Sequence, residues 1–167
     1  SVHDTCARIQ AKIRKFGSSL VPTCNALAEK YGIPVTNKRM AITPIATVCA
    51  GFDKSGFIAV AEALDDAATE IGIDFIGGFS ANVEKGLTPA DLALIAALPE
   101  AMLKTKRVCA SINVGSTRYG INMDAIALLG KTVKELAEIS ASTGGFAAAK
   151  FVIFTNQPGD NPFMAGA

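Results

Sequence analysis

Helix-type and strand-type residue patterns alternate along most of this chain, and this order restricts the available folds more than any other feature. Strand patterns are expected at residues 33–43, 73–83, 108–114 and 149–155. Helical patterns separate them, at residues 55–72, 88–102 and 123–142. Strands that alternate with helices form parallel sheets joined by right-handed crossovers. We therefore predict an α/β protein with a mostly parallel sheet, either open or part of a barrel.

Proline and glycine mark the expected ends and breaks of the helices. Apolar residues follow a helical spacing from residue 4 to residue 31, but Gly17 and Pro22 interrupt it, which predicts two helices or one kinked helix. Thr88 is expected to cap the helix at 88–102, and Pro99 to interrupt its apolar pattern. The C-terminal residues 156–167 fit a loop, in which Phe163 and Met164 are expected to contact other parts of the protein.

Composition excludes several classes of function. The chain has 167 residues, half of them apolar, which favours one globular domain. Sixteen basic and fifteen acidic side chains leave almost no net charge, so a nucleic-acid partner is not expected. No apolar stretch approaches the roughly 20 residues that span a bilayer, and the N-terminus lacks a signal pattern. We expect a soluble, cytoplasmic protein without a membrane partner.

The four cysteines do not have the spacing of a metal site. Cys6, Cys24, Cys49 and Cys109 form no C-x-x-C pair, and His3 is the only histidine. We therefore expect no bound metal, and the sequence identifies no cofactor. The first three cysteines lie among apolar residues and are interpreted as small core residues.

The third strand pattern contains the main candidate site. Its apolar residues alternate with three polar ones, which places the polar side chains on one face of the strand, at Cys109, Ser111 and Asn113. Cys109 is a candidate nucleophile or thiyl carrier, although without a nearby histidine it also fits a packing role.

A second polar group follows this strand. Gly115 permits a sharp turn, and the next residues precede a helix whose free N–H groups favour an anion, at Ser116, Thr117 and Arg118. Asn122 and Asp124 either complete that pocket or cap the helix; we favour capping.

Two further clusters lie on the first and second strand patterns. Asn37, Lys38 and Arg39 either bind a carboxylate or phosphate, or form a solvated strand end. Ser80 follows Gly77 and Gly78, which either admit a ligand or form a bulge. Because the carboxyl ends of parallel strands meet at one edge, all four clusters are expected there, around a small anionic metabolite.

Five sequence blocks together resemble one known family. They are IPVTNKR at 33–39, DFIGGFSA at 74–81, CASINVGSTR at 109–118, GINMDA at 120–125 and DNPFMAGA at 160–167. In this order they resemble the DUF711 (UPF0210) family. The resemblance implies an α/β barrel similar to pyruvate formate-lyase and the glycyl-radical enzymes. No segment here matches the radical-glycine motif, and fold similarity does not transfer chemistry.

Family members are more than twice as long as this chain, so the resemblance implies that residues 1–167 form a partial α/β domain. We expect the remaining half of the same protein, or a second chain, to complete it, and we expect a homo-oligomer. Three functions stay open. The first is an enzyme that acts on a small carboxylate or acyl compound at Cys109, Ser111 and Asn113. The second is a noncatalytic metabolite-binding or regulatory protein, in which Arg39 and Arg118 hold the anion. The third is a structural assembly domain.

Overall fold

The computed structural model describes residues 1–158 and 160–165 and contains a five-stranded, mostly parallel sheet. Four strands are parallel and lie side by side in chain order: β1 (Arg39–Ala41), β2 (Phe75–Asn82), β3 (Val108–Ser116) and β5 (Phe151–Thr155). The short β4 (Gly120–Ile121) pairs antiparallel with the end of β3. The predicted parallel α/β sheet is confirmed, but it is open: within the described residues, β1 and β5 each pair along one edge only.

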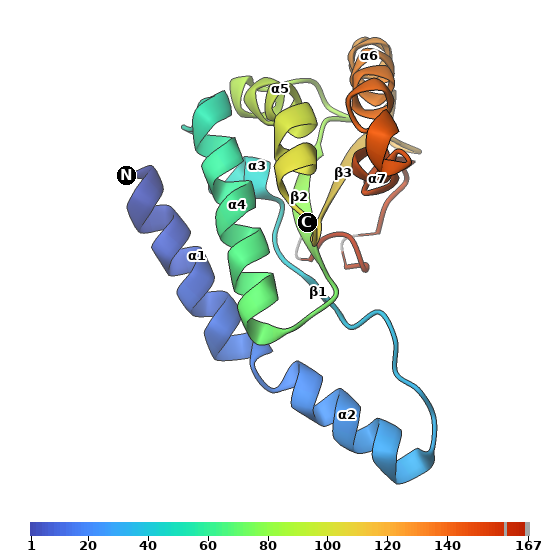
Figure 1. Cartoon of the computed structure of the whole chain (residues 1–167). Coiled ribbons are helices and arrows are strands. Elements are labelled where there is room, and N and C mark those ends of the chain that lie inside the picture. The colour runs from blue at the N-terminus through green and yellow to red at the C-terminus, as the bar shows by residue number, and fades with distance from the viewer. Residues whose placement is uncertain (159, 166–167) are drawn as a thin grey trace.

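The helices that connect the strands form one layer (Figure 1). The connecting elements are α3 (Ile45–Val48), α4 (Lys54–Ile71), α5 (Pro89–Lys104), α6 (Met123–Ile139), η1 (Ala141–Thr143) and α7 (Phe146–Ala149). Helix α4 packs against α5, and α5 packs against α6. Right-handed crossovers between strands that follow one another in space place every helix on the same face, which explains the single layer.

The two faces of the sheet therefore differ. Residues such as Ile76, Phe79 and Ile112 point to the helices and belong to the hydrophobic core. Alternate residues point to the opposite face, which no helix of the described residues covers. We call this the helix-free face; it carries Arg39, Phe75, Gly77, Ser80, Cys109, Ser111, Asn113, Val152 and Phe154.

The N-terminal region forms two helices, as the positions of Gly17 and Pro22 predicted. They are α1 (Val2–Gly17) and α2 (Leu20–Tyr31). Helix α1 packs closely at Gly17, because a Cβ atom there would meet the side-chain ends of Met40 and Ile71. Helix α1 lies along α4, whereas α2 extends away from the body and buries no residue (Figure 1).

The predicted strand at 33–43 is wrong over most of its length, because the paired strand covers only residues 39–41, with flanking backbone hydrogen bonds at Lys38 and Ile42. Asn37 adopts a left-handed backbone conformation (φ 54°), which extended pairing cannot accommodate. The Lys38 N–H donates to Asp74 Oδ2 at 2.7 Å, so a side chain replaces a strand partner there. Ile33 is 62% exposed, unlike a strand residue in a core.

The other predicted elements need smaller corrections. Pro99 lies inside α5 without ending it, and Thr88 caps this helix as predicted, in a capping box with Asp91. The strand at 149–155 begins only at Phe151, since Ala149 still belongs to α7. Residues 166–167, which end the DNPFMAGA block, lie outside the described residues. No helix of the described chain is long and apolar enough to cross a membrane.

Candidate functional site

The strand register brings polar residues together on the helix-free face. Ser80 pairs with Ser111, and Asn82 pairs with Asn113 one step further along. Both serine side chains are fully buried, and neither hydroxyl has a hydrogen-bond partner. Buried hydroxyls are almost always hydrogen-bonded. These two hydroxyls lie side by side and make no hydrogen bond within the described protein.

Asn113 lies next to these serines and is 6% exposed. In one orientation its amide nitrogen donates to Glu84 Oε2 at 3.4 Å. After rotation by half a turn, it donates instead to the carbonyl oxygens of Phe154 and Gly115, both at 3.2 Å. The side chain thus has two alternative sets of acceptors, and the second adds a donor to the Gly115 carbonyl, which also accepts from the Asn156 N–H at 2.8 Å.

A cavity of about 350 Å³ opens on the same face, toward the amino ends of the strands. It joins two residues that are 70 positions apart in the sequence, Arg39 from β1 and Cys109 from β3. Its other lining residues are Phe75, Phe146, Ala149, Lys150, Phe151, Val152 and Phe163. The volume lies in the range of small-molecule sites.

Arg39 lines this cavity and stacks on Phe75. Its guanidinium carbon lies 4.9 Å from the centre of the Phe75 ring, over the ring face. Among the ion pairs within the described residues, none involves Arg39. Stacking fixes the guanidinium plane and leaves its N–H groups available to a carboxylate or phosphate.

The thiol of Cys109 is not activated by its surroundings. Burial raises its pKa above the ordinary value of 9.0, and the positive charges of Arg39 and Lys150 only partly oppose this. Arg39 and Lys150, the two charged groups that act on the thiol, are both cations. Among the described residues, neither a carboxylate nor an imidazole acts on it as a base. A nucleophilic cysteine needs the thiolate, and this site favours the thiol.

Lys150 lies beneath the cavity and has a structural role. Its Nζ donates to the carbonyl oxygens of Met102, at 2.8 Å, and of Thr105. The ammonium therefore caps carbonyl groups at the C-terminal end of α5. Burial lowers the pKa of this ammonium below its ordinary value. The residue is 5% exposed and lines the cavity.

The C-terminal segment 161–165 covers part of the helix-free face, which confirms that Phe163 and Met164 make contacts. The Phe163 ring packs edge-on against Phe154 at 5.0 Å, and Met164 is buried. The N–H of Ala165 donates to the Ile42 carbonyl at 3.0 Å. This segment therefore forms one wall of the cavity.

Close packing explains the two glycines of β2. A Cβ atom on Gly77 would lie 2.7 Å from the Phe163 carbonyl oxygen, and one on Gly78 would lie 2.6 Å from that of Ile42. Gly78 also has φ 113°, at a register shift between Ile76 and Phe79. Both a bulge and a close approach occur here, and the approaching group is the protein's own backbone.

The structure separates the clusters that the sequence placed at one edge. Asn37 and Lys38 precede β1 and lie at the amino edge, where Lys38 Nζ donates to the Val35 carbonyl at 3.1 Å. Ser116, Thr117 and Arg118 follow β3 and lie at the carboxyl edge. Parallel strands place these two edges on opposite sides, so a single pocket cannot contain both groups.

The carboxyl-edge residues form a hairpin turn and not the start of a helix. Ser116 Oγ accepts from the Tyr119 N–H at 3.1 Å, and the Thr117 N–H donates to Asn156 Oδ1 at 2.7 Å. Arg118 stacks on Tyr119. Helix α6 begins only after β4.

Asn122 caps α6, as we favoured. Its Oδ1 accepts from the Ala125 N–H at 3.1 Å, and its Nδ2 donates to the Val83 carbonyl at 2.7 Å. Asp124 is exposed in the first turn. Within the described residues, no three His, Cys, Asp or Glu side chains gather as metal ligands.

Sequence reasoning missed Phe75, Val152 and Phe163 as cavity residues. The signal for Phe75 is its position next to Ile76, because alternation places the two on opposite faces of β2. Val152 is found in the same way from its neighbour Ile153. Nothing in the sequence places Phe163, since its contacts depend on the path of a loop.

The fold and the site define a parallel α/β protein with a cationic, thiol-containing cavity on the helix-free face of its sheet. The chain belongs to the family described as Uncharacterised ACR (DUF711), which it matches over residues 1–167.

Curated relatives of the same family come from bacteria and archaea. A UPF0210 protein of Desulfovibrio desulfuricans is 56% identical over 161 residues, which are 96% of this chain and 35% of the relative. UPF0210 proteins of Syntrophobacter fumaroxidans and Methanococcoides burtonii are 54% and 52% identical, each over 95% of this chain and 35% of the relative. The chain thus spans about a third of the length of these relatives.

Proposed function

We propose that this protein binds a small carboxylate-bearing metabolite on the helix-free face, with Arg39 holding the anionic group. The observation that carries the proposal is the position of Arg39 in a cavity with Cys109, stacked on Phe75 and without an ion-pair partner among the described residues. A guanidinium offers paired donors in a planar fork that matches a carboxylate. The cavity volume of about 350 Å³ limits the ligand to a small molecule, and Val152 and Phe163 add apolar lining.

Ser80 and Ser111 support the same face as a place for polar atoms. They occupy successive strands beyond Cys109, toward the carboxyl edge, and their hydroxyls are unsatisfied. Each hydroxyl offers one donor and two acceptor positions. We propose that these hydroxyls and Asn113 bind the hydroxyl or carbonyl groups of a ligand whose carboxylate lies at Arg39.

The binding function is better supported than thiol catalysis. An acyl transfer to Cys109 needs its thiolate and a base, whereas burial raises the pKa of the thiol and the neighbouring charges are cations. We therefore assign Cys109 to the lining of the site. An enzymatic activity in the complete family member remains the second candidate.

A binding measurement with a matched control tests the proposal. The probes are two- to six-carbon mono- and dicarboxylates, each titrated into the protein by calorimetry, with the corresponding primary amides as uncharged analogues. R39Q should weaken binding of the responding acid by about tenfold or more, the value of one charged hydrogen bond. R118Q removes the same charge at the opposite edge and should leave the affinity unchanged.

Other results would point to other functions. Equal losses in R39Q and R118Q would mean that only net charge matters and would overturn the site. Loss in R118Q alone would move the anion to the carboxyl edge. A carboxylate that is consumed during the titration, detected by mass spectrometry, would establish an enzyme. No binding by any probe to the folded protein would leave the structural role.

We also propose that further strands pair with the open edges of β1 and β5, from the part of the family's length that this chain does not span. The support is topological, because strands in chain order with all helices on one face are the arrangement found in α/β barrels. In such a barrel the helix-free face becomes the interior. Homo-oligomer formation stays a prediction, which analytical ultracentrifugation tests.

A further inference from the structure

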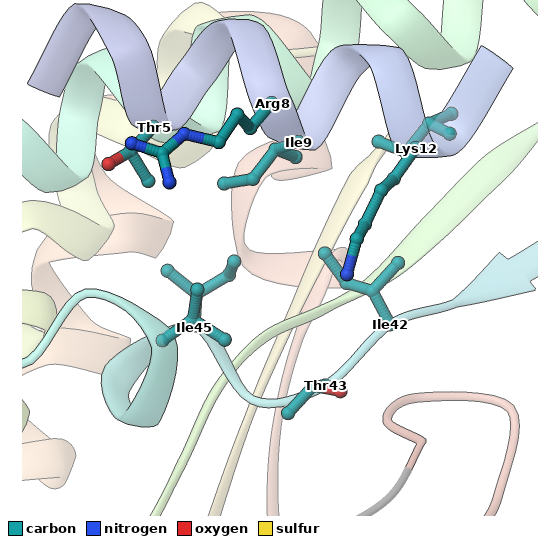
Figure 2. A pocket seen from close by; sticks show the side chains of 9 residues that line it. Thr5, Arg8, Ile9, Lys12, Ile42, Thr43 and Ile45 are labelled. Carbon is teal, nitrogen blue, oxygen red and sulfur yellow. The ribbon is translucent and has the colours of Figure 1, made fainter. Parts of the chain in front are cut away.

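A second cavity lies between α1 and the chain that leaves β1, and it shares no lining residue with the cavity at Arg39. It measures about 360 Å³ (Figure 2). The residues that line it are Thr5, Arg8, Ile9, Lys12, Ile13, Ile42, Thr43, Ile45 and Val48. The cavity therefore lies on the outer side of β1, away from the site proposed above.

The walls of this cavity are mainly apolar. Ile13 and Ile45 are almost completely buried, at 3% and 1% exposure. The Ile9 side chain projects from α1 into the cavity, opposite Ile42 and Ile45 (Figure 2). Apolar side chains that leave an open cavity between them favour an apolar occupant.

Two cations lie on the α1 side of the cavity. Arg8 and Lys12 are four residues apart on one helix, so they lie on the same face, where like charges repel. Both residues line the cavity; Figure 2 shows them on opposite sides of Ile9, with Lys12 extending toward Ile42 and Arg8 extending along α1 toward Thr5. A negative group between them would relieve their repulsion.

Within the described residues, neither cation has an acidic partner. The ion pairs of α1 involve Ser1, His3 and Arg14, and the last of these binds Glu70 at 2.7 Å. Asp4 precedes Arg8 by one helical turn, but its carboxylate accepts from Ser1 Oγ at 2.8 Å in the capping box. Arg14, in contrast, has Glu70 within reach on α4 and forms an ion pair with it.

We propose that this cavity binds a medium-chain acyl anion, with the hydrocarbon chain among Ile9, Ile42 and Ile45 and the carboxylate between Arg8 and Lys12. The apolar walls and the unpaired cations complement the two ends of such a molecule. The volume of about 360 Å³ lies in the range of small-molecule sites. Octanoate, whose eight carbons include the carboxylate carbon, is a ligand of that class.

Calorimetric titration of the protein with sodium octanoate tests the proposal. Octanol keeps the chain and lacks the charge, and acetate keeps the charge and lacks the chain. Octanoate should bind more tightly than both. The double substitution R8Q/K12Q should weaken octanoate binding about tenfold or more, because both charged contacts are lost. K15Q removes one charge from the same helix outside the cavity and should change the affinity less than twofold.

V48E gives an independent test at an exposed wall residue, because it places a negative charge in the apolar lining and should abolish binding. L92E, at an exposed position on α5, is its control. Circular dichroism confirms that each variant is folded, and the single variants R8Q and K12Q replace the double one if it is not. Equal binding of octanol and octanoate, or equal losses in R8Q/K12Q and K15Q, would overturn the proposal.

An anionic membrane surface also offers hydrocarbon chains and negative charges, so the experiment must distinguish it from a free acyl anion. Sedimentation with phosphatidylglycerol vesicles distinguishes the two. The recessed cavity predicts octanoate binding without vesicle binding. Vesicle binding that R8Q/K12Q abolishes, with no octanoate binding, would replace the small ligand by a lipid surface and overturn the proposal as stated.

Discussion

Ser80 and Ser111 lie directly opposite each other on adjacent parallel strands, and both hydroxyls are buried without a protein partner. Replacing either residue with alanine removes an unsatisfied polar group and no hydrogen bond. We therefore expect S80A and S111A to leave the free energy of unfolding unchanged or to raise it by up to about 1 kcal/mol. Chemical denaturation monitored by circular dichroism measures this.

Ser140 provides the matched control for these serines. It is equally buried, but its Oγ donates to the Leu136 carbonyl at 2.6 Å. S140A should lower the free energy of unfolding by about 1 kcal/mol. A comparable loss of unfolding free energy in S80A or S111A would show that these hydroxyls have hydrogen-bond partners in solution. The proposal that they are available to a ligand would then be wrong.

The sequence predicted the fold where periodicity and turn residues agree. Alternation on β3 correctly placed Cys109, Ser111 and Asn113 on one face, because a strand has a period of two. Thr88 and Asn122 cap helices as expected, since their side-chain contacts are local in the chain. These features depend on residues only a few positions apart.

Residue periodicity could not predict which side chains meet in the cavity, because this depends on where each strand begins to pair. Residues 33–38 have the apolar pattern of a strand, yet the left-handed Asn37 and the Asp74 contact to Lys38 delay pairing until Arg39. That delay moves Arg39 to the amino edge, beside Cys109 and away from Arg118. The resemblance gave the family correctly, but the sheet of the described residues is open and does not form the barrel that the resemblance implies.

Gly77 should be intolerant of any side chain. A Cβ atom there would lie 2.7 Å from the Phe163 carbonyl oxygen, so G77A must displace the segment at 161–165. We expect a loss of about 1–3 kcal/mol in the free energy of unfolding, as for other overpacked sites. Hydrogen exchange should show loss of protection at the Ala165 N–H, which donates to Ile42.

Gly130 is the control for this substitution. It lies within α6, and a Cβ atom there would meet nothing within 4 Å. G130A should therefore raise the free energy of unfolding by about 0.5–1 kcal/mol, because alanine favours a helix over glycine. If G77A were as stable as G130A, the C-terminal segment would not pack on β2 as described.

Lys150 should contribute to stability through its contacts with the end of α5. K150M leaves the carbonyl groups of Met102 and Thr105 without their donor, and we expect a loss of about 1–3 kcal/mol at neutral pH. K134M is the control, since Lys134 forms an exposed ion pair at 3.8 Å and its loss should cost under about 0.5 kcal/mol.

The pH dependence of this difference has a defined sign. Burial lowers the pKa of Lys150 below 10.5 in the folded state, so the folded protein binds fewer protons there than the unfolded chain. The contribution of Lys150 to the free energy of unfolding therefore increases with pH between its folded-state pKa and 10.5. The difference in unfolding free energy between the wild type and K150M should grow as the pH approaches 10.5, and a shrinking difference would contradict the lowered pKa.

Cys109 should react as a buried thiol and not as an activated one. Burial raises its pKa above 9.0, so alkylation by iodoacetamide should be slow at neutral pH and accelerate only in more alkaline solution. Arg39 partly opposes that rise, and R39Q should therefore raise the pKa further and slow alkylation at a given pH. Mass spectrometry of the Cys109 peptide over a pH series gives the rates.

Cys49 is the internal control, because burial raises its pKa to about 11 and it should react more slowly than Cys109 throughout the series. R118Q controls for net charge and should leave the Cys109 rate unchanged. An alkylation profile of Cys109 with its midpoint below the ordinary thiol pKa would show a stabilised thiolate. That result would reverse the preference for ligand binding over thiol chemistry, since the nucleophile would then be available at neutral pH.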